Sequence, residues 1–182
     1  SPEQPSRRSA LRENLESLIW AVALALAIRT FIIAPFRIPS GSMRPTLVEG
    51  DRILVNKFLY HFRDPRPSDI IVFRFPNDPK RPFIKRLVAA GGDTVEIRDG
   101  ELLINGQPVQ AQALSATPYY YNQGAFGQPG HPIDVPSGHY YVLGDNSSFS
   151  HDSRFWGLVP RRLLIGRAVC IFWPPRRIQW LR

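Results

Sequence analysis

An apolar segment near the N-terminus constrains this chain more than any other feature. It runs from Leu18 to Phe36, and the only strongly polar residues inside it are Arg29 and Thr30. As an α-helix, the segment would measure about 28 Å at ~1.5 Å per residue, close to the ~30 Å hydrocarbon thickness of a bilayer. A charge within the span is costly, but the long stem of Arg29 lies off-centre and can reach the headgroups. We therefore predict one transmembrane helix over residues 18–36.

The flanks of this segment bear on the orientation of the chain. Residues 1–17 are polar and carry Arg7, Arg8 and Arg12, and basic flanks tend to remain in the cytoplasm. The chain is thus expected to divide into a cytoplasmic tail, the anchor, and a domain over residues 37–182 on the outer side. Two alternatives stay open: a buried or interfacial helix, and a cleaved signal peptide, although no small-residue cleavage site closes the segment.

The rest of the chain has the patterns of β-strands. Runs rich in β-branched and aromatic residues are typical of strands, and Asp99-Gly100 and Asn105-Gly106 are preferred residues of two-residue hairpin turns. The expected strands cover residues 52–60, 69–75, 83–89, 94–98, 101–104, 107–109, 139–143 and 166–172, with a loop over 119–132 and a helical turn near 160–164. The sequence therefore predicts a mainly β fold after the N-terminal helix.

The net charge and the single cysteine limit the function classes. The formal charge of +8 at pH 7 would suit nucleic acid, but the arginines are scattered and no recognised nucleic-acid motif accompanies them. Attraction to anionic lipid headgroups explains the same excess in a chain with an apolar anchor. Cys170 lies in an apolar run, which favours a buried structural thiol. Since no Cys/His spacing fits zinc, we expect neither a metal site nor nucleic-acid binding.

Two short stretches carry residues suited to nucleophilic catalysis. In Ser40-Gly41-Ser42-Met43, a small turn followed by Pro45 can expose a hydroxyl on a fixed backbone, although an ordinary polar turn explains the same residues. Lys85 lies in a predicted strand with apolar neighbours. Apolar burial could lower the pKa of its amine from about 10.4 toward 7 or 8, as a general base requires. A lysine that points away from the sheet is the alternative.

A third stretch, residues 144–160, is dense in polar residues although apolar strands flank it. Polar groups in such a place must be held by their own hydrogen bonds. Asp152 and Arg154 can form a salt bridge that fixes the loop, and Ser150 can exchange a hydrogen bond with a buried lysine. We expect the salt bridge to be structural.

Four blocks thus follow the apolar segment in a fixed order. They are Ser40-Gly41-Ser42-Met43 with Pro45-Thr46-Leu47, Gly50-Asp51 with Ile53-Leu54-Val55, Phe83-Ile84-Lys85-Arg86, and Gly144-Asp145-Asn146 with Ser150, Asp152-Ser153-Arg154 and Trp156-Gly157. Together they resemble the type I signal peptidases, a family of Ser-Lys serine proteases, over about residues 15–175. One position departs from the family pattern, because Ser147 stands where the family usually carries Arg. Local loop geometry could differ there.

The resemblance implies a role for each residue of the site. Ser42 would be the nucleophile and Lys85 the general base. The backbone N–H of Ser42 and the hydroxyl of Ser40 would bind the oxyanion. Ser150 would orient the lysine, and Asp152 with Arg154 would support the site. No cofactor is implied.

The resemblance also implies a fold, a substrate and a location. A small β lobe over about residues 92–140 would be inserted into the catalytic core. Two shallow pockets would admit only small side chains and so select Ala-x-Ala sites; their lining residues would be Phe36, Ile38, Met43, Leu47, Ile53, Val72, Phe83 and Ile84, each of which could instead be plain core. The partners would be preproteins with signal peptides and membrane lipid, at the cytoplasmic or thylakoid membrane, with the catalytic domain on the outer side.

Other function classes compete with this interpretation. A Ser-His-Asp hydrolase would use Ser42 with His151 and Asp152, but two adjacent residues rarely aim at one site. A self-cleaving repressor would share the Ser-Lys pair but bring a DNA-binding domain in place of the anchor. A membrane-anchored β domain that only binds partners is the rival from a different class.

Overall fold

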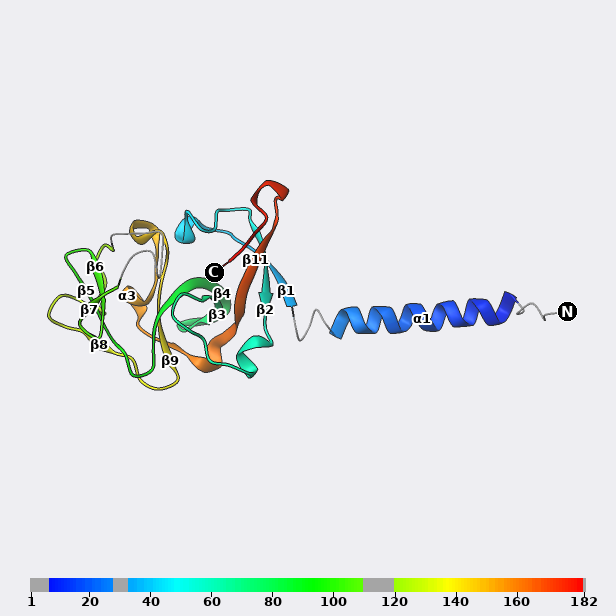
Figure 1. The fold of residues 1–182 in the computed structure, drawn as a ribbon, viewed down its shortest axis with the longest axis horizontal. Coiled ribbons are helices and arrows are strands. Elements are labelled where there is room, and N and C mark those ends of the chain that lie inside the picture. Colours follow the sequence, from blue (N-terminus) through cyan, green and yellow to red (C-terminus); the bar gives the residue numbers. More distant parts are fainter. Residues whose placement is uncertain (1–6, 28–32, 110–119, 182) are drawn as a thin grey trace.

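The chain folds mainly into β-structure, as the sequence predicts (Figure 1). The computed structural model describes residues 7–27, 33–109 and 120–181. Within them, one long helix, α1 (Arg7–Ala27), precedes two antiparallel sheets. In Figure 1 the helix extends away from the β-rich part of the molecule.

The larger sheet has eight strands and contains the residues of the expected site. Its strands are β1 (Ile33–Arg37), β2 (Arg52–Asn56), β3 (Ile70–Phe75), β4 (Asp78–Ala90), β9 (His139–Leu143), β10 (Val159–Pro160), β11 (Leu164–Trp173) and β12 (Gln179–Trp180). The spatial order is β1-β2-β11-β3-β4-β9-β10, and β12 pairs with β11. In the β3/β4 pair, Ile71 lies opposite Lys85. On its other side β4 pairs with β9, where Arg86 lies opposite Leu143, so the strand of Lys85 is also held by a segment far away in the sequence.

The smaller sheet has four strands and follows directly after β4. It consists of β5 (Thr94–Arg98), β6 (Glu101–Ile104), β7 (Gln107–Pro108) and β8 (Ile133–Asp134), in the order β7-β6-β5-β8. These strands fall within residues 92–140, the range expected for an inserted lobe. The turns between them place Asp99-Gly100 and Asn105-Gly106 at positive φ, as hairpin turns of this kind require.

Short helical turns connect the strands. They are η2 (Gly41–Met43), η3 (Leu59–His61), η4 (Ser147–Phe149), α3 (Ser153–Trp156), η5 (Arg161–Leu163) and η6 (Pro175–Arg177). The η5 turn confirms the helical turn expected near 160–164. The strand expected over residues 52–60 ends earlier, at Asn56, because the Asn56 side chain accepts hydrogen bonds from the backbone N–H groups of Phe58 and Leu59, which turns the chain into η3.

The expected helix over residues 18–36 needs correction at both ends. The helix begins earlier, at Arg7, in a segment of good helix formers, and is described as far as Ala27. Ile33–Arg37 form the edge strand β1 instead of the end of a helix. Pro35 explains the change, because proline lacks a backbone donor and is tolerated at the edge of a sheet but not in a helix interior. Residues 28–32 lie outside the described part.

Helix α1 exposes apolar side chains over most of its described length. Leu18, Trp20 and Leu24 have exposed fractions of 60%, 75% and 63%. Across the described residues, however, no helix combines the length and the apolar content needed to cross a membrane.

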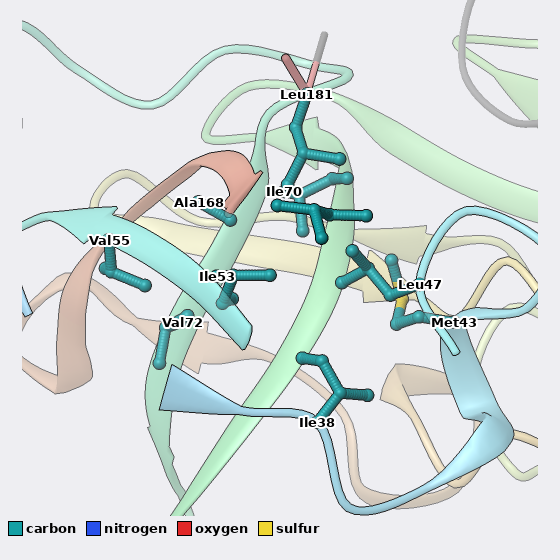
Figure 2. Close-up of a cluster of buried hydrophobic side chains, with 10 residues drawn as sticks. Ile38, Met43, Leu47, Ile53, Val55, Ile70, Val72, Ala168 and Leu181 are labelled. Carbon is teal, nitrogen blue, oxygen red and sulfur yellow. The ribbon is translucent and has the colours of Figure 1, made fainter. Parts of the chain in front are cut away.

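A buried cluster anchors the turn that carries Ser42 to the large sheet (Figure 2). Met43 and Leu47 have no exposed surface, and Figure 2 shows them pointing into a cluster that includes Ile53 of β2, Ile70 of β3 and other strand residues. Fully burying side chains of this kind stabilises the fold by about 1.5–3 kcal/mol each. The turn is thus fixed by packing immediately after Ser42.

Candidate active site

Ser42 lies in the η2 turn, which follows β1. The chain is tied on both sides of this turn, since the Ile38 N–H donates to Asp51 O at 2.9 Å and the Leu47 N–H donates to Met43 O at 2.9 Å. Ser42 itself is buried. The turn predicted to expose a hydroxyl therefore holds it on a fixed backbone, but inside a cleft instead of on the open surface.

Lys85 of β4 reaches Ser42 in the η2 turn. Its Nζ lies 2.7 Å from Ser42 Oγ and also donates to Ile84 O at 3.1 Å. Lys85 has an exposed fraction of 4%, and its Nζ lies 5.6 Å from the centre of the Phe83 ring. The alternative of a lysine pointing away from the sheet is therefore wrong.

Burial lowers the pKa of the Lys85 amine from its ordinary value of 10.5 to about 8. Loss of solvent is the largest cause, because an apolar environment disfavours the charged ammonium. The charges of Asp152 and Asp145 oppose this effect, and the charge of Arg154 adds to it. With this pKa, roughly a tenth of Lys85 is neutral at pH 7, and the neutral amine is the form that can accept a proton.

The loop after β9 closes against Ser42 through Gly144. A Cβ at this position would lie 2.1 Å from Ser150 Oγ and 2.5 Å from Ser42 O, which no side chain could accept without a shift of the backbone. Only glycine allows such close contact between the two segments.

Asp152 and Arg154 form a fully buried ion pair that organises this loop. Arg154 Nε donates to Asp152 Oδ1 at 2.8 Å, and Arg154 Nη2 donates to Asp152 Oδ2 at 2.9 Å. Asp152 Oδ2 also accepts from the Gly144 N–H at 3.0 Å. Arg154 donates further to Ser147 Oγ and to the backbone carbonyls of Tyr121, Ser147 and Ser150. The pair therefore joins the loop to Gly144, as expected for a structural salt bridge.

A second buried ion pair was not predicted from the sequence. Arg86 Nε and Nη2 donate to the two carboxylate oxygens of Asp145 at 2.8 and 2.7 Å. Thr46 Oγ1 donates to Asp145 Oδ2 at 2.5 Å. These bonds connect the strand of Lys85, the loop after β9 and the segment after Ser42. The sequence contains one indication of this pair: Lys85 and Arg86 are adjacent cations in β4, and Asp145 lies in the Gly144-Asp145-Asn146 block.

Ser40 and Ser150, the other two predicted hydroxyls, both lie close to the Ser42 turn. Ser40 Oγ donates to Ser42 Oγ at 3.4 Å and is exposed at the mouth of the site. Ser150 Oγ is buried, and within the described residues it has no hydrogen-bond partner, so no hydrogen bond to Lys85 is present. Its orienting role stays a prediction.

Two hollows with shared walls open at the site, and Ser42 lines the larger one. The larger, of about 280 Å³, is lined by Pro39, Ser40, Ser42, Pro82, Phe83, Ile84, Lys85, Phe149 and His151. The smaller, of about 70 Å³, is lined by Phe36, Arg37, Ile38, Pro39, Ile53, Val72, Pro82, Phe83 and Ile84. Six of the eight predicted pocket residues thus meet in the smaller hollow. Met43 and Leu47 do not line it and belong to the buried cluster.

His151 is close to the site but is not arranged as a Ser-His-Asp triad. Its ring stacks on Phe155, with centroids 5.2 Å apart, and meets Phe75 edge-on at 6.2 Å. In the described part of the chain it makes no hydrogen bond to Ser42 or Asp152. Its contribution, with Phe149, to the wall of the larger hollow was not predicted from the sequence.

Comparisons with known proteins show the family of this chain. A family model described as "Signal peptidase, peptidase S26" matches residues 11–173. Signal peptidase I of Leptolyngbya laminosa is 44% identical over 182 residues, which cover 96% of this chain and 86% of the relative. The probable signal peptidase I-1 of Synechocystis sp. is 41% identical over 180 residues, which cover 95% and 88%.

Similarity extends to a plant protein and to a solved structure. The probable thylakoidal processing peptidase 2 of Arabidopsis thaliana chloroplasts is 40% identical over 174 residues, which cover 92% of this chain and 45% of the relative. A crystal structure of a signal peptidase I from Enterococcus faecalis aligns with a TM-score of 0.46 at 32% identity, over 58% of this chain and 97% of that one.

The family match spans most of the chain and includes every block around Ser42 and Lys85. The first relatives are matched over more than four fifths of their own length. The chain therefore belongs to the signal peptidase family, peptidase S26, and is a peptidase of that family.

Proposed function

We propose that this protein is a membrane-associated serine endopeptidase that removes signal peptides from exported preproteins with a Ser42-Lys85 dyad. The observation that carries the proposal is the 2.7 Å contact between Lys85 Nζ and Ser42 Oγ in a buried site. A nucleophile and a base within hydrogen-bond reach are the minimal parts of acyl transfer.

The proposed reaction begins with proton transfer from Ser42 to Lys85. With the amine neutral, Ser42 O–H donates to the Nζ lone pair, and Oγ attacks the scissile carbonyl carbon while Nζ takes the proton. The tetrahedral intermediate collapses as Lys85 returns that proton to the leaving amine. Water then attacks the acyl-Ser42 ester, with Lys85 accepting its proton and delivering it to Ser42 Oγ. These steps need no reactant other than the peptide and water.

The oxyanion of each intermediate would be stabilised by the Ser42 N–H and the Ser40 hydroxyl. Ser40 Oγ lies 3.4 Å from Ser42 Oγ at the open side of the site, close to where a bound carbonyl oxygen would lie. Fixed donors of this kind contribute about 3–4 kcal/mol to lowering a barrier. Ser150, Asp152 and Arg154 would support the site from behind the loop after β9.

Selection of small residues would come from the smaller hollow. Its volume is about 70 Å³ and its walls are mainly apolar, so it suits a small apolar side chain. Since its walls include Phe83 and Ile84, which also border the larger hollow, an alanine side chain there would lie near Ser42. This supports cleavage after small residues of the Ala-x-Ala type.

The N-terminal part of the chain would associate the peptidase with a membrane. The exposed apolar residues of α1 and the net charge of +8 suit contact with acyl chains and anionic headgroups. The names of the relatives, signal peptidase I and thylakoidal processing peptidase, support a bacterial-type cytoplasmic or thylakoid membrane. The peptidase domain would lie on the outer side, where exported preproteins arrive.

Cleavage of a preprotein by the purified full chain in detergent tests this function. A preprotein with an Ala-x-Ala site should yield a mature protein whose new N-terminus, read by mass spectrometry, follows the second alanine. The Ser42→Ala variant should give no product, whereas Ser137→Ala, at an exposed serine in the turn before β9, should behave as the wild type. Tight preprotein binding without cleavage would instead identify a binding domain.

A further inference from the structure

Asn146 contacts the backbone on both sides of Ser42. Its backbone N–H donates to Ser42 O at 3.1 Å, and its side-chain Nδ2 donates to Gly41 O at 3.1 Å. The two carbonyls belong to the two successive peptide groups that flank the Ser42 Cα. A single residue from the loop after β9 therefore holds both of them.

The bond to Gly41 O controls the direction of another group. Gly41 C=O and Ser42 N–H are the two ends of one planar peptide group, which is trans. In a trans group the carbonyl and the N–H point in opposite directions. When Asn146 Nδ2 fixes the Gly41 carbonyl, it also fixes the direction of the Ser42 N–H.

The same bond strengthens that N–H as a donor. A hydrogen bond to a carbonyl polarises its peptide group, and hydrogen bonds in series reinforce one another. Gly41 O accepts from the Arg44 N–H at 3.1 Å as well as from Asn146. Two donors thus polarise the peptide group that ends in the Ser42 N–H.

The Asn146 side chain is itself held in place. Ser148 Oγ donates to Asn146 Oδ1 at 3.3 Å, which directs the Nδ2 end of the amide toward Gly41. The Asn146 carbonyl accepts from the Phe149 N–H at 3.0 Å. The amide is therefore prepared to donate before any substrate binds.

We propose that Asn146 is a positioning residue that aims the Ser42 N–H at the oxyanion of the tetrahedral intermediate. This inference rests on the proposed Ser-Lys peptidase activity. Asn146 does not touch the substrate; it acts through the peptide group between Gly41 and Ser42. Its removal should weaken transition-state binding while leaving substrate binding intact.

The test compares the full-length wild type with Asn146→Ala and Asn146→Asp, each assayed with a peptide substrate. Asn146→Ala keeps the backbone bond to Ser42 O and loses the bond to Gly41 O, so kcat should fall about tenfold to a hundredfold, less than the ~10²–10³-fold lost with a whole oxyanion donor. KM should change less than about twofold, and the pH midpoint of kcat/KM should not move, because Lys85 is untouched. Asn146→Asp should lose more activity, since it sets an acceptor against the Gly41 carbonyl.

A peptide aldehyde that ends in alanine separates transition-state effects from loss of structure. Ser42 Oγ adds to the aldehyde carbon and the hydroxyl proton passes to the aldehyde oxygen, which then occupies the oxyanion position. In Asn146→Ala, inhibition by the aldehyde should weaken by the same factor as kcat/KM. Inhibition by the matching carboxylate product, which forms no such adduct, should not change.

Asn122→Ala is the matched control. Asn122 Nδ2 donates to Ile97 O at 2.9 Å in the smaller sheet, so this variant loses the same kind of bond away from Ser42 and should keep wild-type kinetics. Wild-type kcat and aldehyde affinity in Asn146→Ala would overturn the inference, as would equal losses of aldehyde and product binding. If Ser42→Ala cleaves as fast as the wild type, the proposed function itself fails. Activity lost in Ser42→Ala but unchanged in Asn146→Ala refutes the role of Asn146 alone.

Discussion

Lys85 Nζ lies 2.7 Å from Ser42 Oγ, although the two residues are 43 positions apart in the sequence. The contact forms inside the fold, where Lys85 is almost fully buried. In the described part of the chain, no carboxylate hydrogen-bonds to Nζ. Burial without a directly bound counter-charge favours the neutral amine, and this gives the pair its expected chemistry.

The pH dependence of cleavage should follow the titration of Lys85. Only the neutral amine can take the Ser42 proton, and burial lowers its pKa to about 8. Below that pH, kcat/KM should therefore rise about tenfold per pH unit, and above it the rate should reach a plateau. A pH profile of kcat/KM with a peptide substrate measures this directly. A profile that is flat from pH 5 to 9 would show that Lys85 is not the base.

The titration of Lys85 should also change the free energy of unfolding, which can be measured without any assay of activity. Between pH 8 and 10.5, Lys85 is protonated in the unfolded chain but neutral in the folded one. The unfolded state then binds more protons, so the free energy of unfolding should rise with pH over this window. Relative to Lys85→Met, the wild type should gain about 2–3 kcal/mol between pH 7 and 10 in denaturant titrations. A constant difference between the two proteins would mean that Lys85 titrates normally.

The sequence suffices to predict much of the site. The apolar neighbours of Lys85 suggest burial, and the small residues around Ser42 suggest a tight turn. Each pattern alone also fits an ordinary turn or a surface lysine, because neither contains the strand register that joins them. The register of β4 against β9, with Arg86 opposite Leu143, depends on pairing between distant segments, and the loop after β9 contacts Ser42. Only the four blocks taken together predicted that the two residues meet.

Gly144→Ala should damage the site through backbone contact. The added Cβ would lie 2.1 Å from Ser150 Oγ and 2.5 Å from Ser42 O, so the loop or the Ser42 turn must move. We expect a loss of about 2–3 kcal/mol in the free energy of unfolding and a clear drop in kcat. Denaturant titration measures the free energy of unfolding and peptide cleavage measures kcat, both on the same preparation.

Gly130→Ala provides the comparison for this variant. A Cβ at Gly130 meets nothing within 4 Å, but its φ of +75° strains an alanine by about 1–2 kcal/mol. This variant should lose some stability and keep its full kcat. Equal kcat values for the two variants would contradict the contact between Gly144 and the Ser42 turn.

Breaking the buried pair of Asp152 and Arg154 should be costly. Asp152→Asn leaves the buried Arg154 guanidinium without its counter-charge, which typically costs about 3–5 kcal/mol. The exposed pair of Arg44 and Glu49, with side-chain exposed fractions of 56% and 40%, is the control. Glu49→Gln should change stability by less than about 1 kcal/mol. Denaturant titration of both variants measures the contrast, and similar losses would show that burial does not determine the cost.

Physical reasons explain why some features of the structure differ from the prediction made from the sequence. The apolar pattern predicts that the helix continues to Phe36, although Pro35 favours the edge strand that the structure has there. Arg86 and Asp145 were not paired because their partnership spans 59 positions and charged residues in strands usually face solvent. Ser150 illustrates the opposite case: the sequence predicts a hydrogen bond to Lys85, but Ser150 Oγ has no partner among the described residues.

The central claim, that Lys85 is the base for Ser42, is tested most directly by kcat/KM for Lys85→Met. Methionine keeps the apolar stem of the side chain and removes the amine. Lys80→Met, at an exposed lysine of the same strand β4, is the matched control. We predict that Lys85→Met loses about 10²–10⁴-fold in kcat/KM while Lys80→Met stays at the wild-type value. A Lys85→Met enzyme as active as Lys80→Met would contradict the account.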